Sequence, residues 1–442
     1  MLRVTAPMSW YGVRILHGSW WSKPLPNDID AARPNDLRSD GPRVQALSDW
    51  LVQQGLRGST LDDLLAGFCE GVRALGIPLW RGHIAMRTLH PSFEALTYRW
   101  LREEGVQRDE IARTDEATLD WKASPFSYML EHDLYALRRR LVGPNAEVDF
   151  GLLETFRDQG GTDYVARILP FGDTELFQRQ TGVLTSWTTD RPEGFRDEEI
   201  AVLDRLQPRL ALTIKSILSD QITRNVADTY IGPEAGKRIL NGEIRRGSVQ
   251  VIHAVIFFAD LRGFTALTEE VPRDELVPML DDYLECMARP IVQHGGQVLK
   301  FLGDGLLATF DLSDKTDDSI CRDTLDAAWE TLQRTDLLNA ARATDGKPTM
   351  AVDVALHLGD VLYGNVGAYD RLDFTVIGPA VNEASRIENL CDKIGRRLLV
   401  SSTFADAATQ CTGRLVSVGS HQLRGLDREQ ELFTLDMPET LS

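Results

Sequence analysis

Two aspartates stand where a protein commonly holds a metal ion. Asp260 ends the apolar, β-branched run VQVIHAVIFFAD, which predicts a buried strand that delivers a carboxylate at its edge. Asp304 lies about forty residues later, at the tip of a β-hairpin predicted from residues 297–301 and 306–310. An aspartate in a hairpin often does no more than form the turn. Its pairing with a second strand-end carboxylate favours a two-metal site for phosphoryl transfer.

Further groups suited to a nucleotide lie near these aspartates and later in the chain. Gly263, Phe264 and Thr265 lead into a predicted helix, and the backbone N–H groups at such a start can cradle a triphosphate. Asn382 and Arg386 are four residues apart, so they project from one face of another predicted helix. That pair can orient a ribose and neutralise phosphate charge, although an exposed polar face explains it equally simply.

A strand, a long helix, a hairpin and a strand–turn–helix unit must position these groups. The long helix is predicted over 273–294, where apolar residues recur at helical spacing. The last unit is predicted from RLDFTVIGPAVNEASRIENLCDKIG, with its turn at Gly378-Pro379. Residues 248–442 are therefore expected to form one α+β domain.

This domain resembles the catalytic domain of class III adenylate/guanylate cyclases. The blocks FFADLRGFT, KFLGDGLLATF and FTVIGPAVNEASR occur in the family's order and spacing over about the last 190 residues. The resemblance implies a ferredoxin-like βαββαβ fold and conversion of ATP to 3′,5′-cyclic AMP and pyrophosphate. It also implies a homodimer, in which the metal aspartates of one subunit meet the base-reading and Asn/Arg residues of the other.

Carried over to this sequence, the resemblance assigns a metal site and a base-reading pair. It implies that Asp260 and Asp304 bind two Mg²⁺ or Mn²⁺ ions per active site, with the carbonyl of Leu261 as a further ligand. Lys300 and Thr375 match the family's base-reading positions. In the family, Lys with Asp or Thr accompanies ATP, whereas Glu with a small residue accompanies GTP. We therefore expect ATP as the substrate.

The remaining carried-over positions concern the phosphates. Asn382 and Arg386 match the transition-state pair, and the loop 263–265 matches the triphosphate-binding segment. Arg424, in HQLRGL, matches a basic position that contacts phosphate in some members, although a solvent-exposed strand residue is an equal reading. Pro379 departs from the Asp that many members carry there, which alters the turn but removes no expected ligand.

Three other functions compete with this interpretation. A guanylate cyclase is disfavoured by Lys300, because guanine would prefer an acidic partner. A catalytically silent, cyclase-like receptor is disfavoured because all the expected polar residues are present. A diguanylate cyclase is disfavoured because its GGDEF-type turn is absent and LGDG is a poor substitute.

Residues 44–217 are expected to form an α+β regulatory domain. Helices are predicted near 44–54 and 60–75 and strands near 77–89, 164–171 and 182–188, with Asp197 capping a further helix. The segment GVLTSWTTDRPEGFRDEEI resembles the end of a GAF-type sensor domain, although an unrelated regulatory domain is the alternative. A GAF-like fold implies a site for a small-molecule effector. His83, His90 and His132 could ligate a metal or haem, but scattered histidines are more often structural.

The complete expected order is an irregular arm at 1–43, the GAF-like domain at 44–217, a helical connector at 218–247 and the cyclase domain at 248–442. The apolar stripe of Ile214, Ile217, Leu218 and Ile222 runs into the connector. Such a stripe needs a partner, and pairing with the same helix of a second subunit is favoured over packing back on its own domain.

Bulk composition excludes some partners and indicates a compartment. The formal net charge of −18 disfavours electrostatic binding to nucleic acid or to an anionic membrane. No stretch approaches the roughly 20 apolar residues that a membrane span needs, and no signal peptide is evident. Five scattered cysteines without a CxxC pair indicate reduced thiols, and we expect a cytoplasmic protein.

Overall fold

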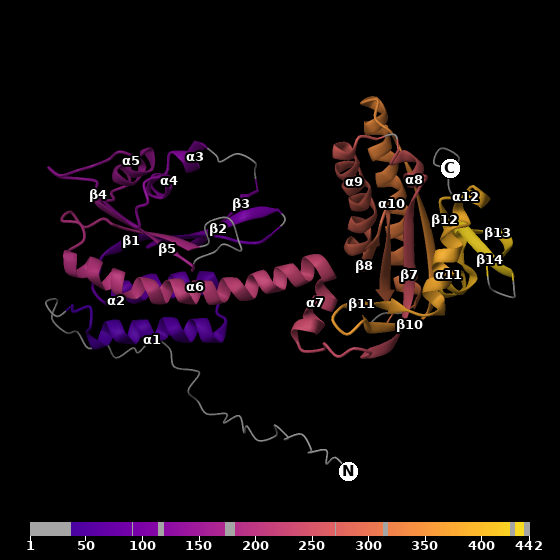
Figure 1. Cartoon of the computed structure of the whole chain (residues 1–442), viewed down its shortest axis with the longest axis horizontal. Coiled ribbons are helices and arrows are strands. Elements are labelled where there is room, and N and C mark those ends of the chain that lie inside the picture. The colour runs from indigo at the N-terminus through magenta and orange to yellow at the C-terminus, as the bar shows by residue number, and fades with distance from the viewer. Residues whose placement is uncertain are drawn as a thin grey trace, which may run out of the picture. The chain divides into compact units, whose positions relative to one another are not determined.

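The computed structural model describes residues 37–90, 92–113, 119–172, 182–269, 271–312, 317–424 and 429–436. The chain divides into two compact units, Met1–Thr223 and Arg224–Ser442 (Figure 1). Residues 1–36 of the expected arm lie outside the described residues, and the first helix begins at Pro42. Among the helices that are described, none has both the length and the apolar character needed to cross a membrane.

A six-stranded antiparallel sheet forms the centre of the first unit. Its strand order is β3-β2-β1-β6-β5-β4. The strands are Leu79–Arg87 (β1), Phe93–Leu101 (β2), Gly105–Ala112 (β3), Ala136–Arg140 (β4), Asp163–Pro170 (β5) and Gly182–Thr189 (β6). The helices are Pro42–Arg57 (α1), Leu61–Ala74 (α2), Leu119–Lys122 (α3), Pro125–Glu131 (α4), Gly151–Asp158 (α5) and Asp197–Ile231 (α6).

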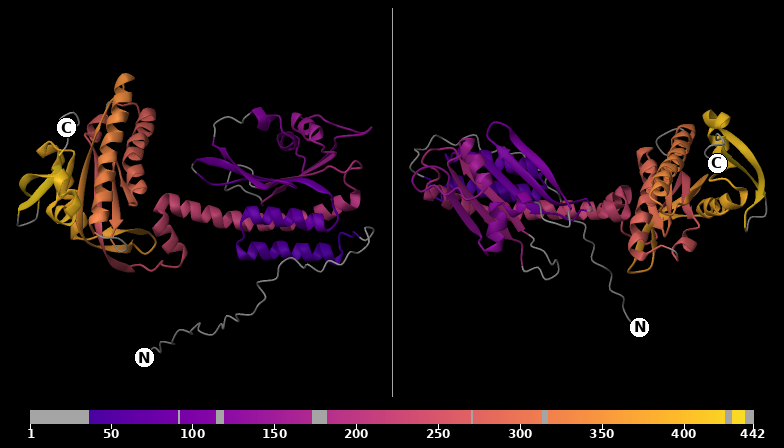
Figure 2. Two further views of the ribbon diagram at one scale, coloured as in Figure 1. Left: turned by 180° about the vertical axis from the view of Figure 1, so that it is seen from behind. Right: turned by 90° about the horizontal axis from the view of Figure 1, so that it is seen from above.

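Helices cover both faces of this sheet. On one face α1, α2 and α6 bury an apolar cluster that includes Phe68 and Trp187, whose ring centroids are 5.1 Å apart. On the other face α4 and α5 bury a smaller cluster around Phe156 and Tyr164. Figures 1 and 2 show these two groups of helices on opposite sides of the strands. The central strands β1, β5 and β6 are therefore largely withdrawn from water, whereas the edge strand β3 is mostly exposed.

The sequence prediction for this unit is partly wrong. Strands β1, β5 and β6 lie where they are predicted, but β2, β3 and β4 have no counterpart in the prediction. The predicted helix cap at Asp197 is also wrong, because its carboxylate accepts a hydrogen bond from Arg138 at 3.1 Å. Glu199 fulfils the capping role by accepting the backbone N–H of Arg196 at 2.8 Å.

The second unit contains an eight-stranded sheet in the order β13-β14-β12-β10-β7-β9-β8, with β11 paired to β10. Its strands are Val249–Arg262 (β7), Gln297–Leu302 (β8), Gly305–Asp311 (β9), Ala351–Gly367 (β10), Leu372–Ile377 (β11), Leu398–Ser401 (β12), Leu415–Gln422 (β13) and Glu429–Leu435 (β14). Its helices are Pro233–Leu240 (α7), Phe264–Leu267 (α8), Arg273–Gln293 (α9), Asp317–Thr344 (α10), Pro379–Glu388 (α11), Cys391–Ile394 (α12), Ser402–Ala407 (α13) and the 3₁₀ helix Thr409–Arg414 (η1).

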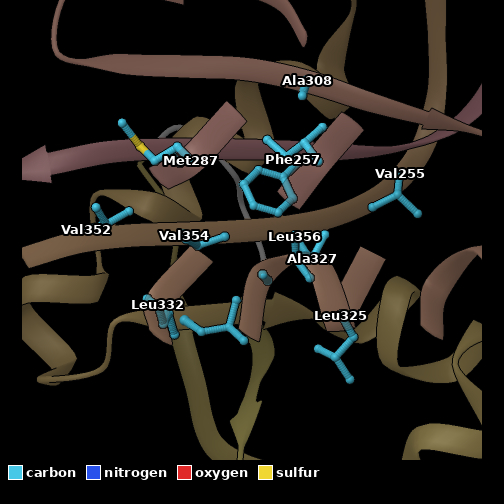
Figure 3. Close-up of a cluster of buried hydrophobic side chains, with 14 of the residues drawn as sticks. Val255, Phe257, Met287, Ala308, Leu325, Ala327, Leu332, Val352, Val354 and Leu356 are labelled. Carbon is cyan, nitrogen blue, oxygen red and sulfur yellow. The ribbon is translucent and has the colours of Figure 1, made fainter. Parts of the chain in front are cut away.

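The central strand β7 is buried from both sides. Along the chain, β7, α9, β8, β9, α10 and β10 follow one another, with β10 and β9 as the two neighbours of β7. Phe257 and Val255 of β7 pack under α9 and α10 with Met287 and Leu325, as Figure 3 shows. The alternate residues of β7, Ala254 and Ile256 among them, pack on the other face with residues of α7, β11 and α11. This double burial fixes the register of the strand that carries Asp260 near its end.

The connector predicted at 218–247 contains two helices separated by one residue. Helix α6 continues without interruption to Ile231, and the division between the two units falls within it, after Thr223. Its apolar stripe of Ile214, Ile217 and Leu218 is buried in the first unit's own cluster, so the prediction that this stripe pairs with a second subunit is wrong. Gly232, with φ 90°, ends that helix, and Pro233 begins α7. Residues 241–248 are not helical and lead directly into β7.

Candidate active site

Asp260 lies near the C-terminal end of β7, between two strands that hold it in place. Ala259 is paired with Leu306 of β9, and Asp260 itself is paired with Asp353 of β10. The adjacent side chain of Leu261 is buried in the core at 3% exposure. Because the neighbours of Asp260 are fixed by register and burial, its partly exposed carboxylate has a defined position at this edge of the sheet.

The tip of the β8–β9 hairpin brings Asp304 to the same place. Gly303 adopts a left-handed conformation with φ 76°, which allows the tight turn. A Cβ atom on Gly305 would lie 2.4 Å from the carbonyl oxygen of Ala259 and 2.5 Å from Oδ1 of Asp260. Only glycine permits this approach without displacement. The hairpin tip that carries Asp304 is therefore pressed against the end of β7.

The two carboxylates repel each other electrostatically. The pKa of Asp260 is raised to about 6, first by burial and then by the negative charge of Asp304, with a smaller contribution from Asp353. The backbone N–H of Leu261 opposes this shift by stabilising the charged form. A divalent cation between the carboxylates would remove the repulsion and favour ionisation of both.

These groups fit a Mg²⁺ or Mn²⁺ ion that also receives oxygen ligands from a substrate. Both side chains offer hard oxygen donors, which these ions prefer. Within the described ranges no group of three His, Cys, Asp or Glu side chains is arranged to hold a metal ion. Mg²⁺ characteristically binds through one or two carboxylates plus water and phosphate oxygens, so two aspartates suffice.

Sequence reasoning missed three charged residues at this edge. Arg262 donates to both carboxylate oxygens of Asp353, at 2.9 and 2.5 Å, and thereby ties β7 to β10 beside the site. Glu388, the last residue of α11, has its pKa raised to about 7 by burial and then by Asp260, with further contributions from Asp353 and Asp304. No motif marked Glu388, because its closeness to the aspartates arises only when α11 packs on the sheet.

The predicted base-reading residues lie together on β8 and β11. Nζ of Lys300 forms an ion pair of 2.6 Å with Oδ2 of Asp373, and both side chains are about half exposed. Thr375 is two residues further along β11, so its side chain lies on the same face of that strand as Asp373. The structure therefore brings Lys300 to the strand that carries Thr375. Asp373 itself was not predicted.

Asn382 and Arg386 lie on the face of α11 that turns away from its own sheet. The buried side of the helix consists of Ala380, Ala384 and Ile387. Because successive helical residues turn by about 100°, Asn382 and Arg386 lie on roughly the opposite side. In the described part of the chain no ion pair or hydrogen bond joins either side chain to the two aspartates. One chain alone does not bring the transition-state pair and the aspartates into contact.

The structure gives fewer contacts for the other positions that were predicted to bind phosphate. Gly263 has φ 80° and leads into α8, which contains Phe264 and Thr265 but is only four residues long. Pro379 occupies the first turn of α11, where its missing N–H leaves no hydrogen bond unmade. Arg424 is exposed just after β13, next to the buried Leu423. The roles of Gly263, Phe264, Thr265 and Arg424 in phosphate binding remain predictions.

The three histidines considered as metal ligands make separate local contacts. The ring of His90 stacks on Phe93 at 3.8 Å, and Nδ1 of His132 contacts the carbonyl of Tyr128 at 2.9 Å. His83 lies beside Phe126 on the sheet. Among the residues that the structure describes, these histidines do not form a metal-binding cluster.

Comparison with known proteins identifies the second unit. Residues 249–437 match the family model described as the adenylate and guanylate cyclase catalytic domain. The second unit contains a class III adenylate/guanylate cyclase catalytic domain. The match begins at the first residue of β7 and includes both aspartates, the hairpin and α11.

Individual relatives of the cyclase domain are longer proteins. An adenylate cyclase of Anabaena cylindrica is 36% identical over 188 residues, which are 42% of this chain and 36% of that protein. An uncharacterized protein of Mycobacterium tuberculosis is 28% identical over 281 residues, 62% of this chain and 43% of its own length. The chain thus matches less than half of the length of either relative. A crystal structure of the adenylyl cyclase CyaB from P. aeruginosa matches 44% of this chain and 99% of that one, at 23% identity and a TM-score of 0.39.

The repulsion at the site predicts a pH-dependent gain in stability on replacing Asp260. Asp260→Asn removes a carboxylate whose pKa in the folded protein is about 6 against an ordinary value of 3.8. Without metal, the variant should exceed the wild type in unfolding free energy by about 1–2 kcal/mol at pH 7.5, after discounting for partial exposure. A raised acid pKa destabilises the fold only where the acid ionises, so the difference should shrink as the pH falls from 6 to 4.

Urea unfolding at the two pH values measures this difference. Asp281→Asn, on the exposed surface of α9, is the matched control and should show no such gain. Added Mn²⁺ should stabilise the wild type more than Asp260→Asn. A variant that is less stable than the wild type at pH 7.5 would contradict the electrostatic description of the site.

Proposed function

We propose that this protein is an adenylate cyclase, which converts ATP to 3′,5′-cyclic AMP and pyrophosphate at a homodimer interface under control of its N-terminal unit. The observation that carries the proposal is the contact between the hairpin of Asp304 and the strand end of Asp260, made possible by Gly305. The Lys300–Asp373 pair supports ATP over GTP, because a lysine N–H donor suits the ring nitrogen acceptors of adenine. Cyclase activity, substrate and assembly are all parts of this proposal.

The proposed reaction is attack of the ribose 3′-hydroxyl on the α-phosphorus, with pyrophosphate leaving. Two Mg²⁺ or Mn²⁺ ions held by Asp260 and Asp304 would acidify the attacking hydroxyl and neutralise triphosphate charge. Asn382 would orient the ribose, and the Arg386 guanidinium would stabilise the charge that develops on the phosphate. The chain's contribution is positioning and electrostatics, because nucleophile and leaving group belong to one substrate molecule.

The orientation of α11 supports a homodimer. Asn382 and Arg386 face away from their own sheet, whereas Glu388 on the same helix lies near Asp260 and Asp304. In a two-fold dimer, the outward face of α11 from one subunit would meet the carboxylates of the other. Each of two equivalent sites would then be built from both chains.

The first unit is proposed to be a GAF-like sensor for a small-molecule effector. This is supported by its six-stranded antiparallel sheet covered by helices on both faces. Helix α6 supplies a covalent route between sensor and cyclase domain, because it begins in the first unit and ends after Thr223. An effector that moves this helix would open or close both active sites.

The first prediction from this proposal is product formation. The purified full chain, incubated with ATP or GTP and Mn²⁺ or Mg²⁺, should form cyclic AMP from ATP only. Asp304→Ala should lower the rate at least about 100-fold, because it removes a ligand of the catalytic metal. The exposed Asp281→Ala should retain the rate. Product from GTP alone would establish a guanylate cyclase, and no product under any metal condition would favour the silent receptor.

A second prediction concerns the shared site. Asp260→Ala and Arg386→Ala should each be nearly inactive, with a loss of about 100-fold or more for the arginine variant. Co-expressed in one cell, they should regain up to about a quarter of the wild-type rate, because half the dimers are mixed and each has one intact site. No recovery, together with mixed dimers seen by differential tagging, would place all the site residues within one chain.

A third prediction concerns the partner of Lys300. Asp373→Asn should free Lys300 and lower the preference for ATP over GTP in kcat/KM about ten-fold, with a smaller change in kcat. The reason is that the 2.6 Å ion pair fixes the position of the base-reading amine. Asp370→Asn, an exposed acid just before β11, is the matched control. An unchanged preference and KM would show that Asp373 does not position the lysine.

A further inference from the structure

One face of the first unit's sheet carries a continuous group of polar side chains, which we call the polar row. In antiparallel strands, residues directly opposite each other point to the same face. The register thereby aligns six side chains over four neighbouring strands: Arg99 on β2, Arg81 and His83 on β1, Ser186 and Thr188 on β6, and Tyr164 on β5.

Two aromatic rings cover the polar row. The guanidinium carbon of Arg81 lies 4.5 Å from the ring centre of Phe156 on α5, which also lies 6.2 Å from the ring of Tyr164. The ring of Phe126 on α4 is 6.0 Å from that of His83. Most of the row is therefore enclosed between the strands and an apolar cover, whereas His83 and Arg99 at one end are partly exposed.

Several groups of the row lack partners. Arg81 is only 8% exposed, and no hydrogen bond or ion pair engages its side chain within the described ranges. Oγ1 of Thr188 and Nε of Arg99 are buried without a hydrogen-bond partner, although Nη2 of Arg99 donates to the side-chain oxygen of Gln107. Buried polar atoms are ordinarily satisfied, and a buried cation without an anion is strongly unfavourable. These atoms together indicate that the row is completed by another molecule.

The charge of the polar row indicates the chemistry of that molecule. Burial, followed by the charges of Arg81 and Arg99, lowers the pKa of His83 to about 3, so this histidine is neutral. Burial raises the pKa of Tyr164 to about 12, so the phenol is also neutral. The neighbouring Arg139 already pairs with Asp149 at 2.9 Å. The row thus contains two positive charges beside hydroxyl groups and aromatic rings, and none of its six residues carries a carboxylate.

We propose that the polar row binds a small organic carboxylate, whose charge pairs with Arg81 and Arg99 and whose apolar body contacts Phe126 and Phe156. The hydroxyl of Thr188, which has no partner in the chain, supplies a further donor to the carboxylate. Arg99 and His83 are partly exposed, so the row opens toward the β2 side of the sheet. Binding itself is independent of the proposed function; only its regulatory effect rests on the proposed sensor role.

Calorimetric titration of the full chain with benzoate, without nucleotide, tests the binding. Benzamide has the same ring without the charge, and inorganic phosphate has the charge without the ring. Benzoate should bind at least about ten-fold more tightly than either, because a buried guanidinium discriminates strongly for an anion. No benzoate binding, or equal binding of benzamide, would overturn the proposal. Equal binding of phosphate would replace it with a site for inorganic anions.

Arg81→Met tests the residue assignment and separates ligand binding from a structural role. The variant should lose at least about ten-fold in benzoate affinity while unfolding, without ligand, at the same temperature as the wild type or higher. Removing a buried cation that has no carboxylate partner should raise the stability of the fold or leave it unchanged. Removing an arginine that holds the structure together would lower it. Arg87→Gln, at the exposed end of the same strand, should change neither property. Unchanged benzoate affinity in Arg81→Met would overturn the assignment.

The rate of cyclic AMP formation with and without benzoate separates this proposal from the proposed function. Benzoate binding without any change in rate would leave the carboxylate site standing and remove its regulatory role. A protein that makes no cyclic nucleotide at all still reports on the site, because the titration needs no turnover.

Discussion

The contact between the β8–β9 hairpin and the end of β7 is the constraint on which the candidate site depends. It forces two carboxylates of like charge together, and burial followed by the resulting repulsion raises the pKa of Asp260. The fold resists that repulsion through burial of β7 on both faces, in one cluster under α9 and α10 and in another under α7 and α11. A shift of one residue would exchange the side chains of these two clusters, moving Phe257 to the face now filled by Ala254 and Ile256, so the strand cannot slide to separate the charges.

The surroundings of the aspartates add negative charge instead of balancing it. Asp353 is paired with Arg262, but Glu388 is held near the same edge with a pKa of about 7. The predicted positive groups of the site, Lys300 and Arg386, do not contact the aspartates within one chain. Under the proposed function, divalent ions and the outward face of a second copy's α11 would supply the balancing positive charge.

The sequence predicted the parts of this site that depend on local patterns. Strand-end and hairpin positions for Asp260 and Asp304 follow from apolar runs and a Gly-Asp-Gly turn, which are properties of a few consecutive residues. The partner of Lys300 could not be predicted in this way, because Asp373 lies 73 residues away and meets it only through the packing of β11. Strands β3 and β4 escaped prediction for a related reason. One is a largely exposed edge strand and the other contains three consecutive arginines, so neither has the apolar alternation that marks a strand.

Two arginines of the first unit, Arg138 and Arg81, show how the polar row differs from a structural ion pair. Asp163, which is fully buried, accepts hydrogen bonds from Arg138 and from the backbone N–H of Phe195. The chain thus supplies a carboxylate where an arginine serves the fold, on the same sheet that carries Arg81. Arg81 is more buried than Arg138 and has an aromatic ring but no acid beside it. An unpaired buried charge lowers stability, so it is retained mainly at functional sites. Arg81 lacks a carboxylate partner in the same way that Asp260 lacks a positively charged partner. In both units the sheet holds an uncompensated charge in place, and the compensating charge is expected to arrive with a ligand.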